Sequence, residues 1–186
     1  MKLLLTLVLV CNIALAKDFD TTPQPIETLK TPDGYKLESY DNRYTFAIPK
    51  GYTVKRGDTE DEFLMIISKG KIISSIIEWP ASNKLLYNAE DFGLKGNRGQ
   101  VLAAIYDKNF TTNKVVNETR AEIFKISTNV QVFKRDNFIF YKKTRVEKGE
   151  IDLIISNLNN DDLIHVLSDK GNEKFFMNFI KTFKSN

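Results

Sequence analysis

Apolar and polar residues alternate along much of the chain, which is the pattern of half-buried β-strands. The alternation is clear over residues 44–48, where a turn at Lys50-Gly51 leads into a second run at 52–54. We predict two strands here, joined by a tight turn. Two nearly continuous apolar runs follow at 63–67 and 72–79, and the glycine between them predicts a β-hairpin in the middle of a sheet.

The second half of the chain repeats this β pattern and adds two helical patterns. The apolar spacing around Val101 to Tyr106 predicts a helix over 97–108, and the aromatic stripe from Phe176 to Phe183 predicts an amphipathic helix over 172–184 that packs on the sheet. The fold class is therefore α+β, an antiparallel sheet flanked by helices. The remaining strands form an antiparallel meander, expected at 121–127, 130–134, 138–146, 151–156 and 163–167.

The first 16 residues have the character of a secretory signal peptide. A short basic start is followed by the apolar run Leu3 to Leu15, and Ala14-Leu15-Ala16 fits cleavage after Ala16. That run is shorter than the ~20 residues of a membrane-spanning helix, so we expect that the protein is not an integral membrane protein. Residues 17–34 carry three prolines and predict an extended N-terminal arm, which leaves 35–186 as a single domain.

Composition narrows the compartment and the partners. The formal net charge is +3, which is smaller than the basic excess typical of a nucleic-acid-binding protein. The single cysteine, Cys11, lies in the signal peptide, so no disulfide is expected in the exported chain. These features favour the bacterial periplasm or secretion.

Candidate chemistry is sparse. The one histidine, His165, shares a strand face with Leu163 and Leu167 and is interpreted as a packing residue rather than a general base. The acidic run at 58–62 lacks the glycine and distal glutamate of a calcium loop and predicts a solvated turn. We therefore expect no catalytic residue, no metal site and no cofactor.

Two groups of residues are candidates for binding. Glycines at the start of the first predicted helix can turn backbone amides toward an anion, with basic side chains beside them, but such a segment can also be a flexible connector. A basic strip on the predicted hairpin can face an acidic partner or can protect a sheet edge from pairing. The anion candidates are Lys95, Gly96, Arg98 and Gly99, and the partner-surface candidates are Lys142, Lys143 and Arg145.

Two short motifs resemble a known superfamily. The segment Tyr44 to Tyr52 is similar to the Phe-x-x-Pro-x-Gly-Trp start of PsbP-like α/β/α sandwich domains, with Tyr52 where tryptophan is usual. The segment Phe176 to Lys184 is similar to their last helix, and the resemblance covers residues 40–186. Members of this superfamily are mostly non-enzymatic accessory proteins and share no catalytic residues. The resemblance therefore implies a protein of this kind.

The sequence thus favours an exported bacterial binding protein that acts through protein–protein contacts, with an unknown protein or envelope component as its partner and an undetermined oligomeric state. Two alternatives stay open. One is a periplasmic carrier of a small apolar ligand or lipid, since 13 phenylalanines and 7 tyrosines could line a cavity. The other is a carboxylate-dependent hydrolase.

Overall fold

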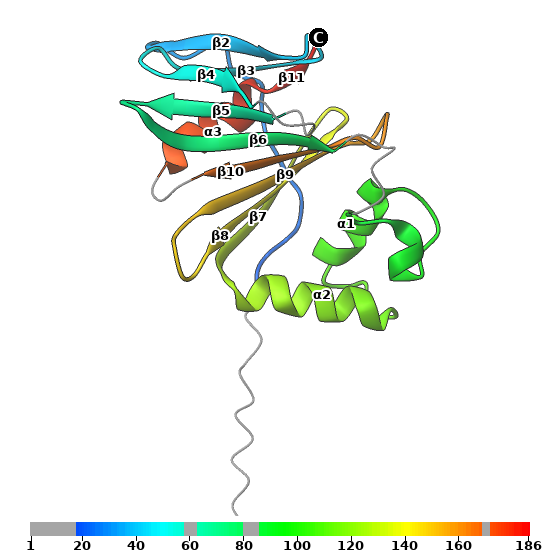
Figure 1. Cartoon of the computed structure of the whole chain (residues 1–186). Helices are drawn as coiled ribbons and strands as arrows, with labels where there is room; N and C mark the ends of the chain where they lie inside the picture. Colours follow the sequence, from blue (N-terminus) through cyan, green and yellow to red (C-terminus); the bar gives the residue numbers. More distant parts are fainter. Residues whose placement is uncertain (1–17, 58–62, 80–85, 169–171) are drawn as a thin grey trace, which may run out of the picture.

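The computed structural model describes residues 18–57, 63–79, 86–168 and 172–186. An eight-stranded sheet in the order β1-β7-β8-β9-β10-β6-β5-β4 forms the centre, and a three-stranded sheet in the order β11-β3-β2 lies beside it (Figure 1). The strands are β1 (Gln24–Pro25), β2 (Tyr35–Tyr40), β3 (Tyr44–Pro49), β4 (Thr53–Arg56), β5 (Phe63–Ser68), β6 (Lys71–Trp79), β7 (Ser127–Arg135), β8 (Phe138–Arg145), β9 (Ile151–Asn157), β10 (Leu163–Ser168) and β11 (Lys184–Ser185).

One face of the large sheet is covered by helix α3 (Glu173–Thr182) and by the three-stranded sheet. Phe176, Phe179 and Ile180 of α3 are buried in this core together with Phe46 and Ile48 of β3. The Phe46 and Phe179 rings lie 4.7 Å apart between their centroids. The aromatic stripe read from the sequence is therefore the main packing face of α3.

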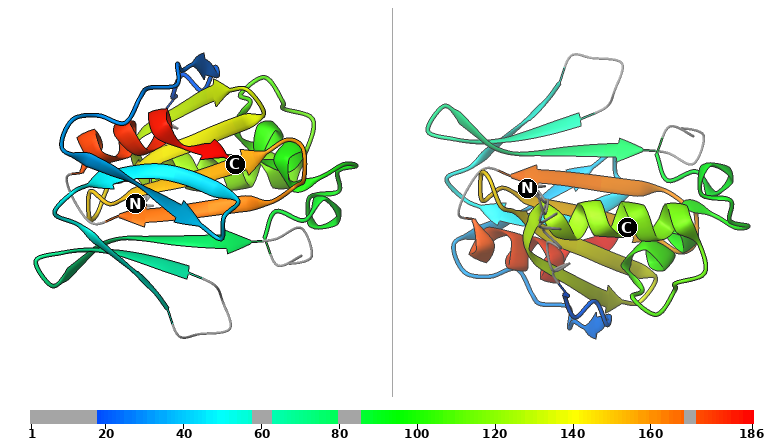
Figure 2. Two further views of the ribbon diagram at one scale, coloured as in Figure 1. Left: turned by 90° about the horizontal axis from the view of Figure 1, so that it is seen from above. Right: turned by 90° about the horizontal axis from the view of Figure 1, so that it is seen from below.

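The opposite face is covered over only part of its width. The short helix η1 (Ala89–Phe92) and helices α1 (Arg98–Tyr106) and α2 (Lys114–Lys125) form a second core with β7, β8 and β9. Seen from below in Figure 2, β5 and β6 extend beyond these helices. The two cores together place helices on both faces of the sheet.

Most of the predicted elements are confirmed, and with them the α+β class. The hairpin pairs β5 with β6 in the interior of the sheet, and its turn residues Lys69 and Gly70 both have positive φ, at 51° and 76°. This is the geometry of a type I′ turn. The meander from β7 to β10 is antiparallel throughout, and the two predicted helices begin and end within two residues of α1 and α3.

The strand predicted at 121–127 is wrong, because residues 114–125 form helix α2 and the strand begins only at Ser127. The buried stripe of α2 contains Arg120 between Val116 and Ile123, which breaks the apolar period that marks a helix. The Arg120 guanidinium donates hydrogen bonds to the carbonyls of residues 104, 105 and 110 at 2.7 to 2.8 Å. Burial of a cation in this way is visible only once the neighbouring carbonyls are in place.

The two strands predicted at 44–48 and 52–54 and the tight turn between them are confirmed, but the strands do not pair with each other. Both segments are strands, but β3 pairs with β2 and β11 in the small sheet, whereas β4 pairs with β5 at the edge of the large one. The turn at 50–51 therefore joins two sheets. Local sequence specifies a turn there, and the burial of β3 against α3 decides which strands become its neighbours.

The N-terminal arm runs along the domain in an extended path. Within the arm, Gln24 and Pro25 form β1, which pairs in parallel with β7. The Phe19 ring packs edge-on against the Phe124 ring, with 5.2 Å between the ring centroids. The predicted signal peptide and the acidic run at 58–62 lie outside the described residues.

Arg135 at the end of β7 ties this strand to the end of α3. Its buried guanidinium donates to the carbonyls of Ile180 and Lys181 at 2.9 Å each and to that of Phe183. We expect Arg135→Met to lower the free energy of unfolding by about 3 kcal/mol, because three buried carbonyls lose a charged donor. Urea denaturation measures this. The exposed neighbour Lys134 is the control, and equal midpoints for Arg135→Met and Lys134→Met would contradict the prediction.

Candidate functional site

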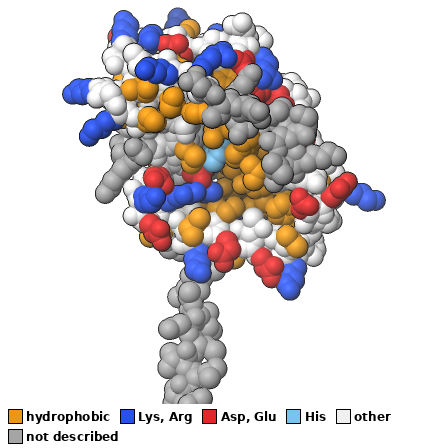
Figure 3. Space-filling model, in the orientation of Figure 1, with side chains coloured by type: hydrophobic (Ala, Val, Ile, Leu, Met, Phe, Trp, Pro, Cys, Tyr) orange, Lys and Arg blue, Asp and Glu red, His pale blue; other side chains and the backbone are white. Residues whose placement is uncertain are grey.

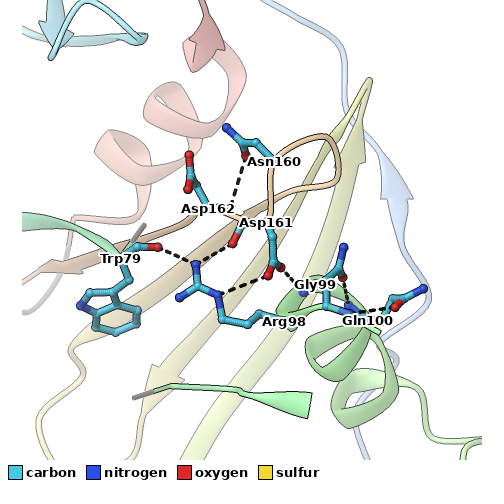
Figure 4. Close-up of polar contacts among 8 residues, drawn as sticks. Trp79, Arg98, Gly99, Gln100, Asn160, Asp161 and Asp162 are labelled. Atoms are coloured by element: carbon cyan, nitrogen blue, oxygen red, sulfur yellow. Dashed lines mark hydrogen bonds and ion pairs between the residues drawn. The ribbon is translucent and has the colours of Figure 1, made fainter. Parts of the chain in front are cut away.

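The predicted anion segment binds a carboxylate of the protein itself (Figure 4). Arg98, at the first turn of α1, donates to the carbonyls of Trp79 at 2.7 Å and of Asp161 at 2.6 Å. The Asp161 carboxylate accepts from the Gly99 amide at 3.3 Å and lies 3.7 Å from Nε of Arg98. The helix N-terminus therefore holds an anion supplied by the β9–β10 turn.

The other two residues of that prediction lie apart from this contact. Lys95 is exposed, and Gly96 adopts φ +124° beside the Gln100 side chain. Gln100 and Asn97 form a reciprocal capping box at the start of α1, with hydrogen bonds of 2.9 and 3.0 Å. Only Arg98 and Gly99 are thus brought together.

We expect Asp161→Gly to create the anion site that the carboxylate now fills. Glycine tolerates the positive φ of 59° at this position, so the change removes the charge without adding backbone strain. Phosphate, compared with chloride at equal ionic strength, should raise the melting temperature of the variant and leave that of the wild type unchanged. Asp136→Gly is the matched control, since Asp136 also has positive φ, at 51°. An equal response of all three proteins to phosphate would contradict the prediction.

The three partner-surface candidates are divided between the two faces of the sheet. Lys142 is 1% exposed on the α3 side, where its ammonium group lies 2.7 Å from Glu173 and 2.9 Å from the side-chain oxygen of Gln131. Lys143 and Arg145 point to the opposite face, because side chains alternate along β8. Both lie near the carboxylate of Asp152 on β9.

Asp152 is the centre of a charged cluster on this second face. Its Oδ1 accepts a hydrogen bond from Nε2 of His165 at 2.7 Å, and its Oδ2 lies 3.1 Å from Lys143 and 3.6 Å from Arg145. Burial raises the pKa of the Asp152 carboxyl, but the His165 hydrogen bond and the Lys143 and His165 charges lower it by more, so the net pKa lies below its ordinary value. Asp152 therefore stays ionised.

The strand register places this cluster in two rows that cross the sheet. One row runs through Phe63, Ile77, His165, Ile154 and Tyr141, and the next runs through Met65, Ser75, Leu167, Asp152 and Lys143. Helices α1 and α2 cover the end of these rows that lies on β7 and β8. The end on β5 and β6 is uncovered by any described helix.

We call this uncovered surface the open half-face. In Figure 3 apolar side chains lie on either side of the histidine, and Lys and Arg side chains are visible nearby. The Trp79 ring lies 4.8 Å from that of His165, and a hollow of about 260 Å³ is lined in part by Ser75, Arg145 and His165. The partly exposed apolar residues of the open half-face are Phe63, Met65, Ile73, Ile77, Trp79 and Leu167.

The cluster has part of the arrangement of a nucleophilic triad. Asp152 orients His165, but within the described residues no hydroxyl is hydrogen-bonded to the histidine ring. The acids Glu78 and Asp162 both contact the guanidinium of Arg43, at 2.6 and 3.7 Å, which is typical of a structural ion pair. The described residues also contain no group of three histidine, cysteine or acidic side chains that could hold a metal ion.

The sequence prediction missed Asp152, although a signal was present. An acid in the otherwise apolar strand 151–156 must be buried, and a buried carboxylate needs a cationic partner. Its alternation with Ile151 and Leu153 places it on the second face. What sequence could not supply was the register that sets Lys143 and His165 on either side of it.

We expect Asp152→Asn to lower the free energy of unfolding by about 3 kcal/mol at neutral pH, because Lys143 and His165 lose a buried anion. Since the folded-state pKa of Asp152 lies below the ordinary 3.8, its ionised form contributes stability above pH 3.8. That contribution is lost as pH falls through the lower folded-state value, so the gap between wild type and variant should narrow in acid. Urea unfolding at pH 7, 5 and 3.5 measures it, with the exposed Asp91→Asn as control. A gap that widens below pH 3.8 would contradict this assignment.

Comparison with known proteins finds similarity among solved structures. No family model matches the chain, and no curated protein does. Among solved structures, the solution structure of cyanobacterial PsbP (CyanoP) from Synechocystis sp. PCC 6803 matches with 16% identity and a TM-score of 0.46, covering 82% of this chain and 93% of that one. The two sequence motifs described above resemble PsbP-like domains as well. Among the described residues no helix is long and apolar enough to cross a membrane.

Proposed function

We propose that this chain is an exported, non-catalytic binding protein that docks a protein segment on the open half-face. The observation that carries the proposal is the uncovered end of the two side-chain rows, where Phe63, Met65 and Trp79 remain partly exposed. Aromatic and methionine side chains are enriched in protein interfaces. A contiguous exposed apolar surface with a charged border is typical of an interaction site.

The chemistry of Arg145 indicates what the partner brings. Its guanidinium forms ion pairs with Glu150 at 3.7 Å and Asp152 at 3.6 Å, both longer than a hydrogen bond, and the side chain is 42% exposed. A carboxylate on the partner can accept hydrogen bonds from this group. The partner segment therefore carries an apolar side chain for the hollow and an acidic residue for Arg145.

Export is supported by the sequence alone. The basic start, the apolar run and Ala14-Leu15-Ala16 have the order of a signal peptide, and the chain after residue 16 contains no cysteine. A periplasmic or secreted binding protein follows from these features together with the open half-face. The alternative of a carboxylate-dependent hydrolase stays a prediction that none of the contacts described above favours.

The proposal is tested by a photo-crosslinking amino acid placed at Met65 or Ile77 in the cells that make the protein. We expect the same discrete adduct from both positions and none from Leu37, an exposed residue of β2 that lies outside the open half-face. Arg145→Gln should reduce the yield of that adduct by about tenfold, since one charge-assisted contact is lost. Lys36→Gln, at a partly exposed residue of β2 that is likewise paired with an acid, is the matched control.

Melting temperatures of the variants establish that each is folded. Failure to form an adduct from either open position, an identical adduct from Leu37, or an adduct that Arg145→Gln leaves unchanged would each overturn the proposal.

A further inference from the structure

A second cleft lies where the N-terminal arm passes beside α1, and we call it the arm cleft. It shares no lining residue with the hollow at His165. Its volume is about 590 Å³, which is within the range of small-molecule sites. The arm, α1 with the loop after it, and strands β7 and β8 all contribute to the lining. The apolar lining residues include Pro23, Ala103, Ala104, Phe110, Val132 and Ile139.

The arm cleft is an opening at the edge of the second hydrophobic core. Ala104, Phe110 and Ile139 pack against that core yet remain partly exposed, and all three line the cleft. The small side chains of Ala103 and Ala104 leave room on this side of α1 that larger residues would fill. An apolar molecule in the cleft would remove the partly exposed side chains from water, and burial of apolar surface is the dominant favourable contribution to most association.

The two charged residues of the lining, Asp107 and Lys108, have opposite sign, and both already have partners. The Asp107 carboxylate accepts a hydrogen bond from the Asn109 amide at 2.9 Å, and the Lys108 ammonium group lies 3.9 Å from the Asp18 carboxylate. A charged group that entered the cleft would lose its hydration without gaining an unpaired counter-ion. This desolvation cost favours an uncharged ligand.

One wall of the arm cleft is fixed by Arg120 of α2. Its buried guanidinium donates to the carbonyls of Ala104 and Phe110 at 2.8 Å each, which joins the end of α1 to the loop that follows it. The planar guanidinium holds its donors in fixed directions, so these two lining residues are kept at a set separation. This wall is therefore preformed.

Another wall is the N-terminal arm, which is anchored on both sides of the cleft. On one side the Phe19 ring packs on Phe124, with 5.2 Å between the ring centroids, and on the other β1 pairs with β7. Residues 21–23 lie between these anchors and contribute directly to the lining. The arm is therefore a strap along the cleft, and the Phe19 contact holds one end of the strap in place.

We propose that the arm cleft binds a small, uncharged, apolar molecule, and that the arm holds this molecule against α1 and β8. The volume sets the size of the ligand, the partnered charges set its neutrality, and the partly exposed apolar side chains supply its contacts. This site is independent of the open half-face, so the docking of a protein partner and the binding of a small ligand are separate properties of the chain.

The test uses two fluorescent probes that differ only by a sulfonate group, the neutral phenylnaphthylamine and the anionic anilinonaphthalene sulfonate, titrated into the purified protein. We expect the neutral probe to bind saturably at one site per chain. Ala104→Trp, which fills the cleft, should abolish this binding, and Val115→Trp at an exposed position of α2 should leave it unchanged. Ala103→Trp, at an exposed position of the lining, is a second cleft-filling variant.

The anionic probe tests the neutrality of the ligand. Its binding to the arm cleft, measured as the part that the cleft-filling variants remove, should be weaker than that of the neutral probe by about tenfold or more, because the sulfonate is desolvated without an unpaired cation.

The role of the arm is tested with Phe19→Ser. We expect this variant to bind the neutral probe about fivefold more weakly, because the strap loses one anchor while every lining residue is kept. Leu29→Ser is the matched control, since Leu29 is an exposed residue of the arm that does not line the cleft.

Circular dichroism and melting temperatures show that the variants are folded. The absence of saturable binding of the neutral probe would overturn the proposal, as would wild-type affinity in the cleft-filling variants, equal affinity of the two probes for the cleft, or unchanged affinity in Phe19→Ser. Binding that Met65→Asp abolishes and Ala104→Trp leaves intact would place the ligand on the open half-face and would also overturn it.

Discussion

The arrangement of the whole molecule depends on one constraint, which is that the central strands of the large sheet have to be buried on both faces. Strand β9 is buried at every residue. On one face the aromatic stripe of α3 and the small sheet cover it completely, and on the other α1 and α2 reach only as far as β9 and part of β10. The open half-face exists because the described helices of this second layer do not extend over β5 and β6.

Buried arginines bind backbone carbonyl groups that have no partner within their own helix, strand or turn. Arg98, Arg120 and Arg135 are all nearly inaccessible, and each donates to backbone carbonyls of a segment distant from it in the chain. The planar guanidinium has several donors in fixed directions, so one side chain can bind two or three carbonyls. Some of the basic residues therefore hold elements together in the interior. For this reason the number of basic residues in the chain predicts little about the charge of its surface.

The open half-face combines apolar side chains with a charged cluster. An ionised Asp152 is held there by Lys143 and His165, and the neighbouring Arg145 is close to two acids without a hydrogen bond to either. This arrangement suits a partner with a charged group.

The sequence by itself determined the elements whose signals are local. The turn glycine at position 70, the apolar runs on either side of it and the aromatic period of α3 each act within a few residues, so the hairpin, the meander, the two helices and the α+β class could be predicted. Helix α2 was not predicted, because Arg120 interrupts the apolar period that marks a helix. Strand β3 acquired neighbours in the small sheet because its burial against α3 depends on residues more than 100 positions away.

Only the tertiary structure decided the sites. Lys142 and Lys143 are adjacent in sequence, yet the alternation of β8 sends one into a contact with α3 and the other to Asp152. Arg98 and Gly99 had the chemistry of an anion site, and the β9–β10 turn supplied the anion from within the chain. Register and loop placement arise from the summed packing of many distant residues, whereas the sequence pattern reports only on neighbours, and this is the physical reason that the fold could be predicted further than its function.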